Sequence, residues 1–150
     1  MSTSNAREVH GGCLCGDIRF TVTLPTLFCG HCHCGMCRRN HGAAFVTWIA
    51  APRSQVSIDS GVAQLTRYES SEDGSRSFCC RCGSSLLCVS SRHPEVIDIP
   101  LAIMDGPIDR LPESQIYFDD RASWTIVADD LLYLAPAAAG EFVAYRIPLR

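Results

Sequence analysis

Three short cysteine motifs constrain the fold of this chain more than any other feature of its sequence. Cys32, Cys34 and Cys37 stand at C-x-C-x-x-C spacing. If this stretch forms a tight turn, its three thiolates can converge on one centre at about 2.3 Å, the usual zinc–sulfur distance. Thiolates are soft ligands that suit Zn²⁺ or an iron–sulfur cluster better than Mg²⁺ or Ca²⁺. We therefore expect a metal centre at this stretch.

Two further motifs each supply half of a second site. Cys13 and Cys15 form a C-x-C step among glycines, and Cys79 and Cys82 form a C-x-x-C step followed by Gly83. Glycine permits the positive φ angles that let the backbone turn its N–H groups toward metal-bound sulfur. Together the four thiolates make a closed tetrahedral set, which is the form of a structural zinc site. We expect this site to join the first strand to a later hairpin and to stabilise the fold.

The C-x-C-x-x-C set has three members, and three protein ligands with an open fourth position are typical of a catalytic zinc. Cys29 offers an alternative, because it extends the motif to C-x-x-C-x-C-x-x-C and would close the site. His31 and His33 could also bind metal as neutral imidazoles, although a residue beside a ligand in a tight turn usually points elsewhere. A role near the metal or in contact with substrate is the better interpretation of His33. Arg38 and Arg39 place positive charge beside the thiolates.

The chain has ten cysteines, and we interpret them as metal ligands rather than disulfides. The first ten residues lack the basic and apolar regions of a signal peptide, so we expect a cytoplasmic protein. Without secretion a disulfide framework is disfavoured. We expect Cys80 to point away from the metal and Cys88 to be a small buried residue in a strand.

Charge and hydropathy exclude two classes of partner. The net charge is −3, the 13 basic residues are all arginines, and apart from the adjacent Arg38 and Arg39 they are scattered singly. Nonspecific nucleic-acid binding and anchoring on an acidic membrane surface both need clustered positive charge. No apolar run approaches the roughly 18 residues that a membrane-spanning helix needs. The oligomeric state is not indicated by the sequence.

Strand patterns dominate the chain, whose 150 residues and 47% hydrophobic content fit one domain. Residues 17–24 alternate between apolar and polar side chains, which is typical of a half-buried strand, and Pro25 ends the pattern. The single helical candidate is 125–134. We expect further strands at 43–51, 56–58, 65–68, 86–89, 96–104, 116–118 and 142–147.

The metal motifs resemble those of a known family, the glutathione-dependent formaldehyde-activating enzymes, which share their domain with centromere protein V. The match consists of G-C-x-C-G at 12–16, C-H-C-x-x-C-R at 32–38 and F-C-x-x-C-G at 78–83, in the family's order. Fainter matches at Pro112, 116–118 and Trp124 extend the resemblance over most of residues 9–134. It implies one zinc-binding domain over 1–150 with a β-tent fold, in which a structural zinc clamps two antiparallel sheets.

The resemblance also implies two zinc ions per chain and an activity. The reaction joins glutathione to formaldehyde, gives S-hydroxymethylglutathione and is classed with carbon–sulfur lyases. Zinc can keep a bound thiol deprotonated, and attack on formaldehyde then needs proximity and a proton donor. His33 and His41 are candidate donors, and Arg38 adds charge. The implied structural ligands are Cys13, Cys15, Cys79 and Cys82, and the implied catalytic ligands are Cys32, Cys34 and Cys37.

Two other functions stay open at this point. The chain could be a noncatalytic, zinc-stabilised binding module, as centromere protein V suggests, or a thiol-based metal or redox sensor. Occupancy of the fourth zinc position distinguishes the enzyme from the module. Reversible loss of metal on oxidation would support the sensor.

Overall fold

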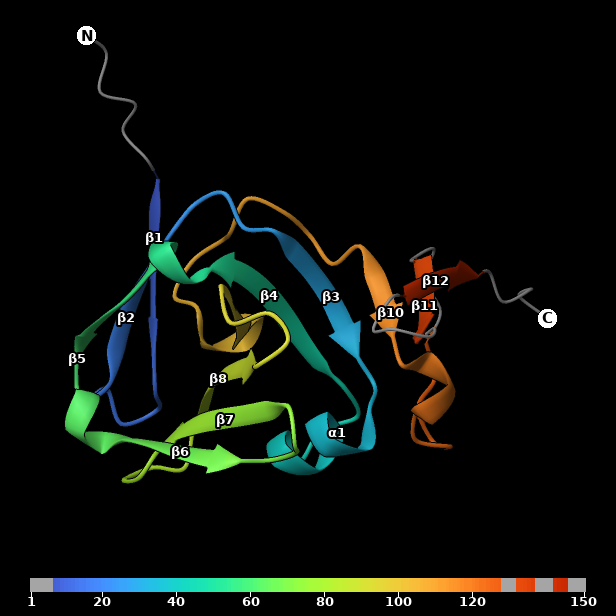
Figure 1. Cartoon of the computed structure of the whole chain (residues 1–150), viewed down its shortest axis with the longest axis horizontal. Coiled ribbons are helices and arrows are strands. Elements are labelled where there is room, and N and C mark those ends of the chain that lie inside the picture. Colours follow the sequence, from blue (N-terminus) through green and yellow to red (C-terminus); the bar gives the residue numbers. More distant parts are fainter. Residues whose placement is uncertain (1–6, 128–131, 137–141, 146–150) are drawn as a thin grey trace, which may run out of the picture. The chain divides into compact units, whose positions relative to one another are not determined.

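The computed structural model describes residues 7–127, 132–136 and 142–145, and these are mainly β, as predicted (Figure 1). Among them the single α-helix is α1 (Gly35–His41). The strands are β1 (Glu8–Gly12), β2 (Arg19–Thr23), β3 (Phe28–Cys32), β4 (Val46–Pro52), β5 (Val56–Ser60), β6 (Leu65–Glu69), β7 (Gly74–Cys79), β8 (Ser85–Ser90), β9 (Val96–Pro100), β10 (Ser114–Ile116), β11 (Leu132–Pro136) and β12 (Phe142–Tyr145). The short 3₁₀ helices are η1 (Arg53–Gln55), η2 (Val62–Gln64), η3 (Leu101–Ile103) and η4 (Phe118–Asp120). None of the helices described here is long and apolar enough to cross a membrane.

The chain folds into two compact units. The first unit contains Met1–Phe28 and Ile49–Arg110, and the second contains Cys29–Trp48 and Leu111–Arg150. One cysteine group lies in each unit, so each candidate metal site is built within a single compact body. The single domain over residues 1–150 stays a prediction.

A three-stranded antiparallel sheet, ordered β1-β2-β5, begins the first unit. Its central strand shows the predicted alternation, because Phe20 and Val22 are fully buried while Arg19 and Thr21 are partly exposed. Gly61 follows β5 at φ 76°, and a β-carbon there would stand 2.3 Å from the carbonyl oxygen of Asp17. A glycine is therefore needed where this backbone passes so close to the start of β2.

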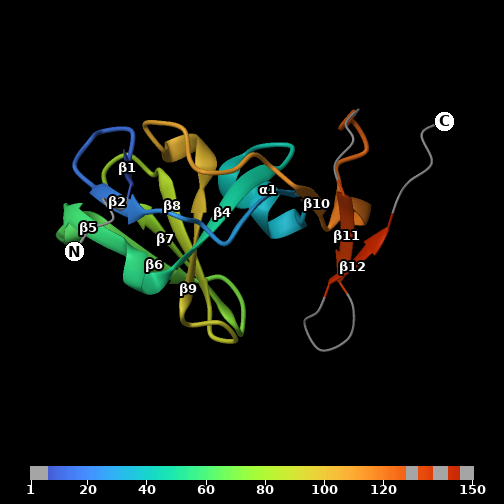
Figure 2. The same cartoon turned by 90° about the horizontal axis from the view of Figure 1, so that it is seen from above.

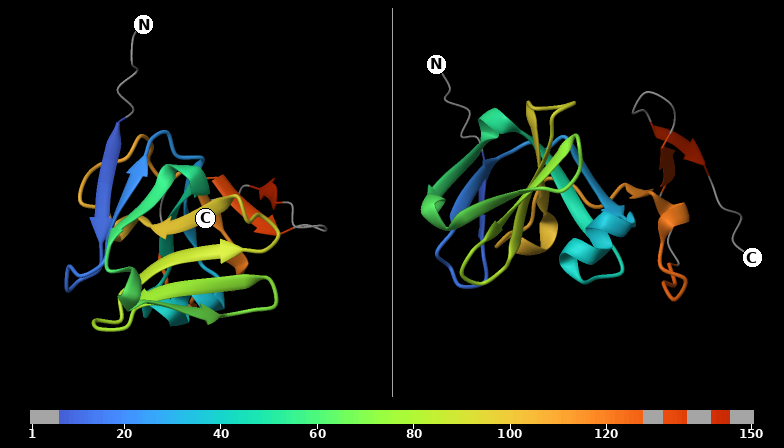
Figure 3. Two further views of the ribbon diagram at one scale, coloured as in Figure 1. Left: turned by 60° about the vertical axis from the view of Figure 1, so that its left-hand side comes forward. Right: turned by 60° about the horizontal axis from the view of Figure 1, so that its bottom comes forward.

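The rest of the first unit is an antiparallel meander of β6, β7, β8 and β9, with the end of β4 beside β9 (Figure 3). Leu86, Ile97 and Ile99 fill its core. The strand expected over 96–104 ends earlier, at Pro100, and η3 follows it. Proline has no N–H to donate to a sheet ladder, which explains why strand pairing stops there.

The sheet of the second unit is mixed, which corrects the expectation of purely antiparallel sheets. Its order is β12-β11-β10-β3-β4, and β10 runs parallel to both β3 and β11. β12 is antiparallel to β11, and these two strands lie side by side in Figure 2. The strand expected over 116–118 is Ser114–Ile116 instead, because Tyr117 leaves the extended conformation. The strand predicted at 142–147 is present as β12, as far as the described residues go.

The helix predicted over 125–134 is wrong wherever the structure describes it. Residues 125–127 are irregular, residues 128–131 lie outside the described residues, and Leu132–Leu134 belong to β11. Tyr133 is buried, with its ring 4.4 Å from that of Phe118. Pairing with β10 and this aromatic contact outweigh a weak helical propensity, as tertiary context commonly does.

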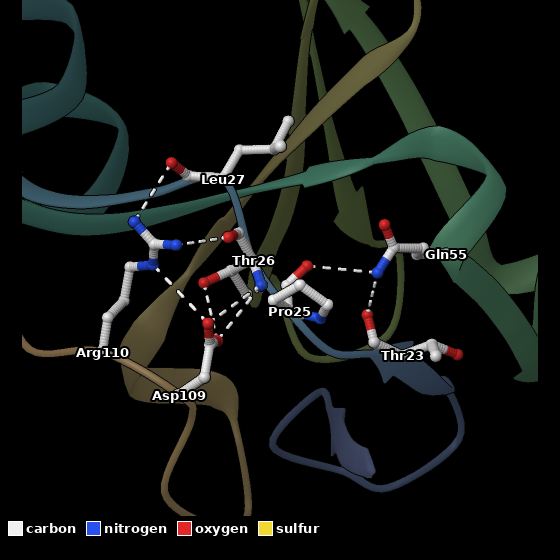
Figure 4. A network of polar contacts seen from close by, with 7 residues as sticks. All are labelled: Thr23, Pro25, Thr26, Leu27, Gln55, Asp109 and Arg110. Atoms are coloured by element: carbon white, nitrogen blue, oxygen red, sulfur yellow. Dashed lines mark hydrogen bonds and ion pairs between the residues drawn. The ribbon is translucent and has the colours of Figure 1, made fainter. Parts of the chain in front are cut away.

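A polar network in the first unit holds the turn at 23–27, which follows β2 (Figure 4). The Asp109 carboxylate accepts hydrogen bonds from the backbone N–H and the hydroxyl of Thr26, at 3.1 and 2.8 Å. Arg110 donates to two carbonyl oxygens of the turn at 2.6 and 3.2 Å, and Gln55 donates to two others at 2.5 and 3.1 Å. The turn therefore has most of its polar backbone groups satisfied by side chains from distant segments.

Replacing Asp109 with asparagine should destabilise the protein by about 1–2 kcal/mol at neutral pH, because it removes the charge from these hydrogen bonds. Burial alone raises the pKa of the Asp109 carboxyl, but the bonds from Thr26 and the charge of Arg110 outweigh burial and lower it. A lowered folded-state pKa gives stability that is present above the unfolded pKa of about 3.9 and is lost as pH falls through the folded value. Urea unfolding from pH 7 to about pH 2.5 measures this, because that range spans both the unfolded and the lowered folded pKa.

The stability difference between wild type and Asp109→Asn should stay constant from pH 7 to about pH 5 and shrink below that. Glu72→Gln is the matched control, because it removes the same charge from an exposed loop position. Its stability should stay within about 0.5 kcal/mol of wild type. A difference for Asp109→Asn that grows as pH falls would contradict the network described here.

Candidate metal centres

Four cysteines of the first unit converge on one point. The Sγ atoms of Cys13, Cys15, Cys79 and Cys82 all lie within 4.8 Å of one another. Cys13 and Cys15 are 3.5 Å apart at sulfur, and Cys15 and Cys79 are 3.8 Å apart. A tetrahedral zinc with Zn–S bonds of 2.3 Å requires sulfur–sulfur edges of about 3.8 Å. The donor set and its spacing therefore fit a closed four-thiolate zinc site.

Local backbone turns bring these thiols together. Gly16 and Gly83, each directly after a cysteine, adopt φ angles of 82° and 75°, as the motifs predicted. The turns are closed by hydrogen bonds from Gly16 N to Cys13 O at 3.0 Å and from Gly83 N to Cys79 O at 2.8 Å. In addition, the backbone N–H of Ile18 donates to Cys13 Sγ at 3.3 Å. Each motif is thus a preformed turn with N–H groups directed at sulfur.

Ser84 links the two turns and was not singled out from the sequence. Its hydroxyl accepts from Leu14 N at 2.9 Å and lies 3.2 Å from Cys82 Sγ, to which it can donate. Arg81 and Asp17 form a second link, an ion pair of 2.6 Å. A serine or an ion pair beside a cysteine motif has many ordinary roles, so only the folded arrangement identifies these two connections.

The thiols of this group differ in acidity, which also favours a cation. Hydrogen bonds from the Ser84 hydroxyl, the Ser84 N–H and the Cys15 N–H lower the pKa of Cys82 to about 5. The Asp17 N–H lowers the pKa of Cys15, but Cys13, burial and the remaining thiols outweigh it and raise the pKa to about 12. Four adjacent thiolates repel one another unless a positive charge lies between them. A bound Zn²⁺ would supply that charge.

The second group lies in the second unit, where β3 leads into α1. Cys32 ends β3, Cys34 is the N-cap of α1, and Cys37 lies in its first turn; their Sγ atoms are within 4.8 Å of one another. The Cys37 N–H donates to Cys34 Sγ at 3.3 Å, so the thiol also caps the helix. The helix ends at His41, and the αL conformation of the next residue, Gly42, lets its N–H donate to Arg38 O. We expected only a tight turn here, because the seven residues of α1 carry no helical apolar pattern.

The three thiols leave one side of a tetrahedral set open within the described residues. No other Cys, His, Asp or Glu in the described ranges has a ligand atom within 4.8 Å of all three. Cys29, the alternative fourth ligand, is fully buried on β3 three residues before Cys32. Side chains three apart on a strand point to opposite faces, so Cys29 is directed away from the group. Cys34 is the most exposed member, which places solvent access on its side.

Electrostatics at this group again favour a cation. The neighbouring Cys34 and Cys37 thiols, followed by burial, raise the pKa of Cys32. The three thiols therefore resist ionising together unless a positive charge offsets their repulsion. Thiolates in this number and spacing fit Zn²⁺, with Cys32, Cys34 and Cys37 as the residues that would hold it.

Comparison with known proteins agrees with this geometry. The sequence profile of the family described as glutathione-dependent formaldehyde-activating enzyme matches residues 8–120, which include all seven grouped cysteines. The chain belongs to this family. A Halomonas elongata protein with the provisional name of glutathione-dependent formaldehyde-activating enzyme is 26% identical over 123 residues, covering 77% of this chain and 78% of that protein.

Two further relatives support the assignment to the formaldehyde-activating enzyme family. An uncharacterized lyase of Schizosaccharomyces pombe is 28% identical over 116 residues, covering 76% of this chain and 81% of the yeast protein. The crystal structure of a Rhodobacter sphaeroides protein superposes with a TM-score of 0.57 at 27% identity, covering 67% of this chain and 91% of that one. Residues 121–150 of the present family member lie beyond the profile match.

In this formaldehyde-activating enzyme family member, His33 is a core residue. Its side chain is fully buried, and its Nε2 donates to Gln115 Oε1 on β10 at 2.5 Å, since a carboxamide oxygen can only accept. The ring also packs 5.2 Å from both Phe45 and Phe118. Burial argues against the predicted contact of His33 with substrate. The ring instead anchors the backbone between Cys32 and Cys34, a role that the sequence did not reveal because Gln115 is 82 residues away.

The other candidate donors and charges have defined places as well. Arg38 donates from Nε to His33 O and from an Nη to Asp120 O, each at 3.1 Å, so its guanidinium joins α1 to the η4 turn. Arg39 is exposed. His31 Nδ1 bonds the Thr47 hydroxyl at 2.9 Å, and His41 packs edge-on against Trp48. Neither histidine belongs to the metal-ligand groups found among the described residues.

The remaining cysteines differ partly from expectation. Cys80 is exposed and stands outside the four-thiol group, as expected for a residue that points away from the metal. Cys88 is half-buried on β8 rather than fully buried.

Proposed function

We propose that this chain is a zinc-dependent enzyme of the carbon–sulfur lyase class that joins glutathione to formaldehyde and gives S-hydroxymethylglutathione. The observation that carries the proposal is the three-thiol group with its open side, because a closed four-ligand set would leave no place for substrate. Family membership supports the same reaction class. The four-thiol group would hold a second, structural zinc.

The residues around the open site would carry out distinct tasks. A zinc held by three thiolates can keep a fourth thiol deprotonated near neutral pH and so supply a sulfur nucleophile. Cys32 and Cys37 are buried and hold the rigid side of the site, whereas the more exposed Cys34 borders the access to it. His33 and Arg38 fix the loop and helix that present the thiols.

The reaction balances without an oxidant or a reductant. The sulfur of glutathione forms a bond to the carbon of formaldehyde while the carbonyl π bond opens. The oxygen takes up one proton, which replaces the proton that the thiol released. The chain must therefore bring the two reactants together and provide a proton at oxygen.

Thiol titration tests this function. With two zinc ions per chain, glutathione binding should release about one proton per chain near pH 7, because a free thiol titrates near 8.5 and a metal-bound one is deprotonated. Calorimetry in buffers of different ionisation enthalpy counts this proton. X-ray absorption at the zinc edge should show sulfur coordination of the second metal rising from three to four.

The rival functions give other results in the same titration. A binding module with a closed second site shows no released proton and no change at the zinc edge. A single zinc per chain, or an iron–sulfur absorption band, would contradict the proposed metal content. Glutathione-dependent consumption of formaldehyde by the zinc-loaded protein completes the test, and its absence rejects the enzyme.

A further inference from the structure

Tyr117 has an unusual backbone for its residue type. Its φ and ψ are 51° and 43°, and it is the sole non-glycine residue with positive φ among the residues described. A residue with a β-carbon rarely adopts this conformation, and a bulky one rarely does so without a reason. Here the Tyr117 N–H donates to Leu134 O at 3.2 Å, and the Asp120 N–H donates to Tyr117 O at 3.1 Å. Strained residues that are fixed in this way concentrate at functional sites.

Both ends of the segment that contains Tyr117 are attached to the elements that carry the three thiols. On one side Ile116 lies opposite Cys32 in the β10–β3 pair, and His33 N donates to Ile116 O at 2.9 Å. On the other side Arg38 of α1 donates to Asp120 O at 3.1 Å. Tyr117 lies between these two attachments. Burial is the largest cause that raises the pKa of the Tyr117 hydroxyl, and the charges of Cys32, Cys34 and Cys37 are the next largest.

The Tyr117 hydroxyl is a hydrogen-bond donor that the described residues leave unused. The side chain is half-buried, and its ring packs edge-on against Phe142 at 5.6 Å. No residue in the described ranges accepts a hydrogen bond from it, so among these residues its proton is left available to solvent or to a ligand. By contrast, the Nε2 proton of His33 and two N–H groups of Arg38 already have acceptors within the protein.

We propose that the Tyr117 hydroxyl donates a hydrogen bond to the formaldehyde oxygen while the glutathione sulfur attacks the carbon, and is a catalytic residue. This inference rests on the proposed function. As the carbon–sulfur bond forms and the π bond opens, negative charge develops on oxygen. The hydroxyl stabilises that charge and passes its proton to oxygen, and solvent, which received the thiol proton, restores it. A donor held in place for a developing charge contributes more to rate than to ground-state binding.

The kinetic test compares Tyr117→Phe with the matched control Tyr68→Phe, which removes the same hydroxyl from an exposed site on β6. Tyr117→Phe should lower kcat for S-hydroxymethylglutathione formation by about 10²-fold, the usual effect of losing one positioned donor. Its zinc content and the proton released on glutathione binding should equal those of wild type. Tyr68→Phe should match wild type in every measurement. Equal activity of both variants overturns the inference but leaves the proposed function intact.

A spectroscopic test needs no variant at position 117. The chain has four tyrosines, so 3-fluorotyrosine labelling gives four ¹⁹F resonances, and phenylalanine variants at the other three positions assign that of Tyr117. The Tyr117 resonance should shift when formaldehyde joins bound glutathione, by more than with glutathione alone, while that of Tyr68 stays in place. An unmoved Tyr117 resonance in an active protein rejects the inference. A wild-type protein that consumes no formaldehyde rejects the proposed function and this inference together.

Discussion

Cys82→Ala is expected to yield protein that is unfolded or insoluble. The four-thiol group joins two turns that are more than sixty residues apart in the sequence, so a metal bound there would close the fold of the first unit. Structural zinc sites of this kind contribute on the order of 10–16 kcal/mol at neutral pH. The whole stability margin of a domain is about 5–15 kcal/mol, so loss of this site leaves no net stability. Circular dichroism, solubility and zinc content measure the outcome.

Cys80→Ala is the matched control for this prediction. Cys80 directly follows the ligand Cys79 but is exposed and stands outside the four-thiol group. It should retain two zinc ions and a melting temperature within a few degrees of wild type. If Cys82→Ala melted like wild type, the proposed pairing of the two motifs would be wrong. Cys13→Ala, like Cys82→Ala, should yield protein that is unfolded or insoluble.

Cys34→Ala, in contrast, is expected to fold and to lose function. The second group draws its three thiols from one short segment, so a metal bound there would close no long loop. The substitution should remove the second zinc and lower glutathione-dependent formaldehyde consumption by at least about 10³-fold, because the nucleophile is no longer activated. Cys34 Sγ also caps α1, so a stability loss of about 1 kcal/mol should accompany the change.

Two further variants distinguish the possible causes of this loss. One separates loss of the metal from loss of the helix cap, and the other tests whether Cys29 closes the second site. Cys34→Ser keeps an oxygen that can cap the helix, so it should regain most of the stability and none of the activity. Cys29→Ser should keep both zinc ions and the thiol response, because Cys29 lies on the opposite face of β3. Loss of the second zinc in Cys29→Ser, with a flat thiol titration, would show a closed site and reject the enzyme.

The grouping of cysteines could be predicted from the sequence because metal ligation depends on short spacings. C-x-C, C-x-x-C and C-x-C-x-x-C each direct their thiols to one side of a local turn, and Gly16 and Gly83 adopt the positive φ that such turns require. β2 could be predicted from the alternation of apolar and polar side chains along the chain. The face on which a strand residue lies follows directly from its odd or even position. Both inferences use contacts between residues that are close in the chain.

Residue roles at the open site required the tertiary structure. His33 looks like a metal-adjacent donor in the sequence, but Gln115, from a strand 82 residues later, binds its Nε2 within the core. The helix predicted after residue 125 is replaced in part by β11, whose stability comes from pairing with β10. Tyr117 attracts no attention in the sequence, because its conformation depends on bonds to Leu134 and Asp120 and its ring packs against Phe142 of β12.

The sequence by itself therefore determined the mainly β class, the two sets of thiols and the family resemblance. Only the tertiary structure decided that Cys29 points away from the second set, that His33 and Arg38 support the site from the protein side, and that no residue in the described ranges accepts a hydrogen bond from the Tyr117 hydroxyl. The physical reason is the separation along the chain of the residues that interact. Thiol spacing and strand parity are local properties of the backbone, whereas burial and hydrogen-bond partners depend on segments that meet only when the chain folds.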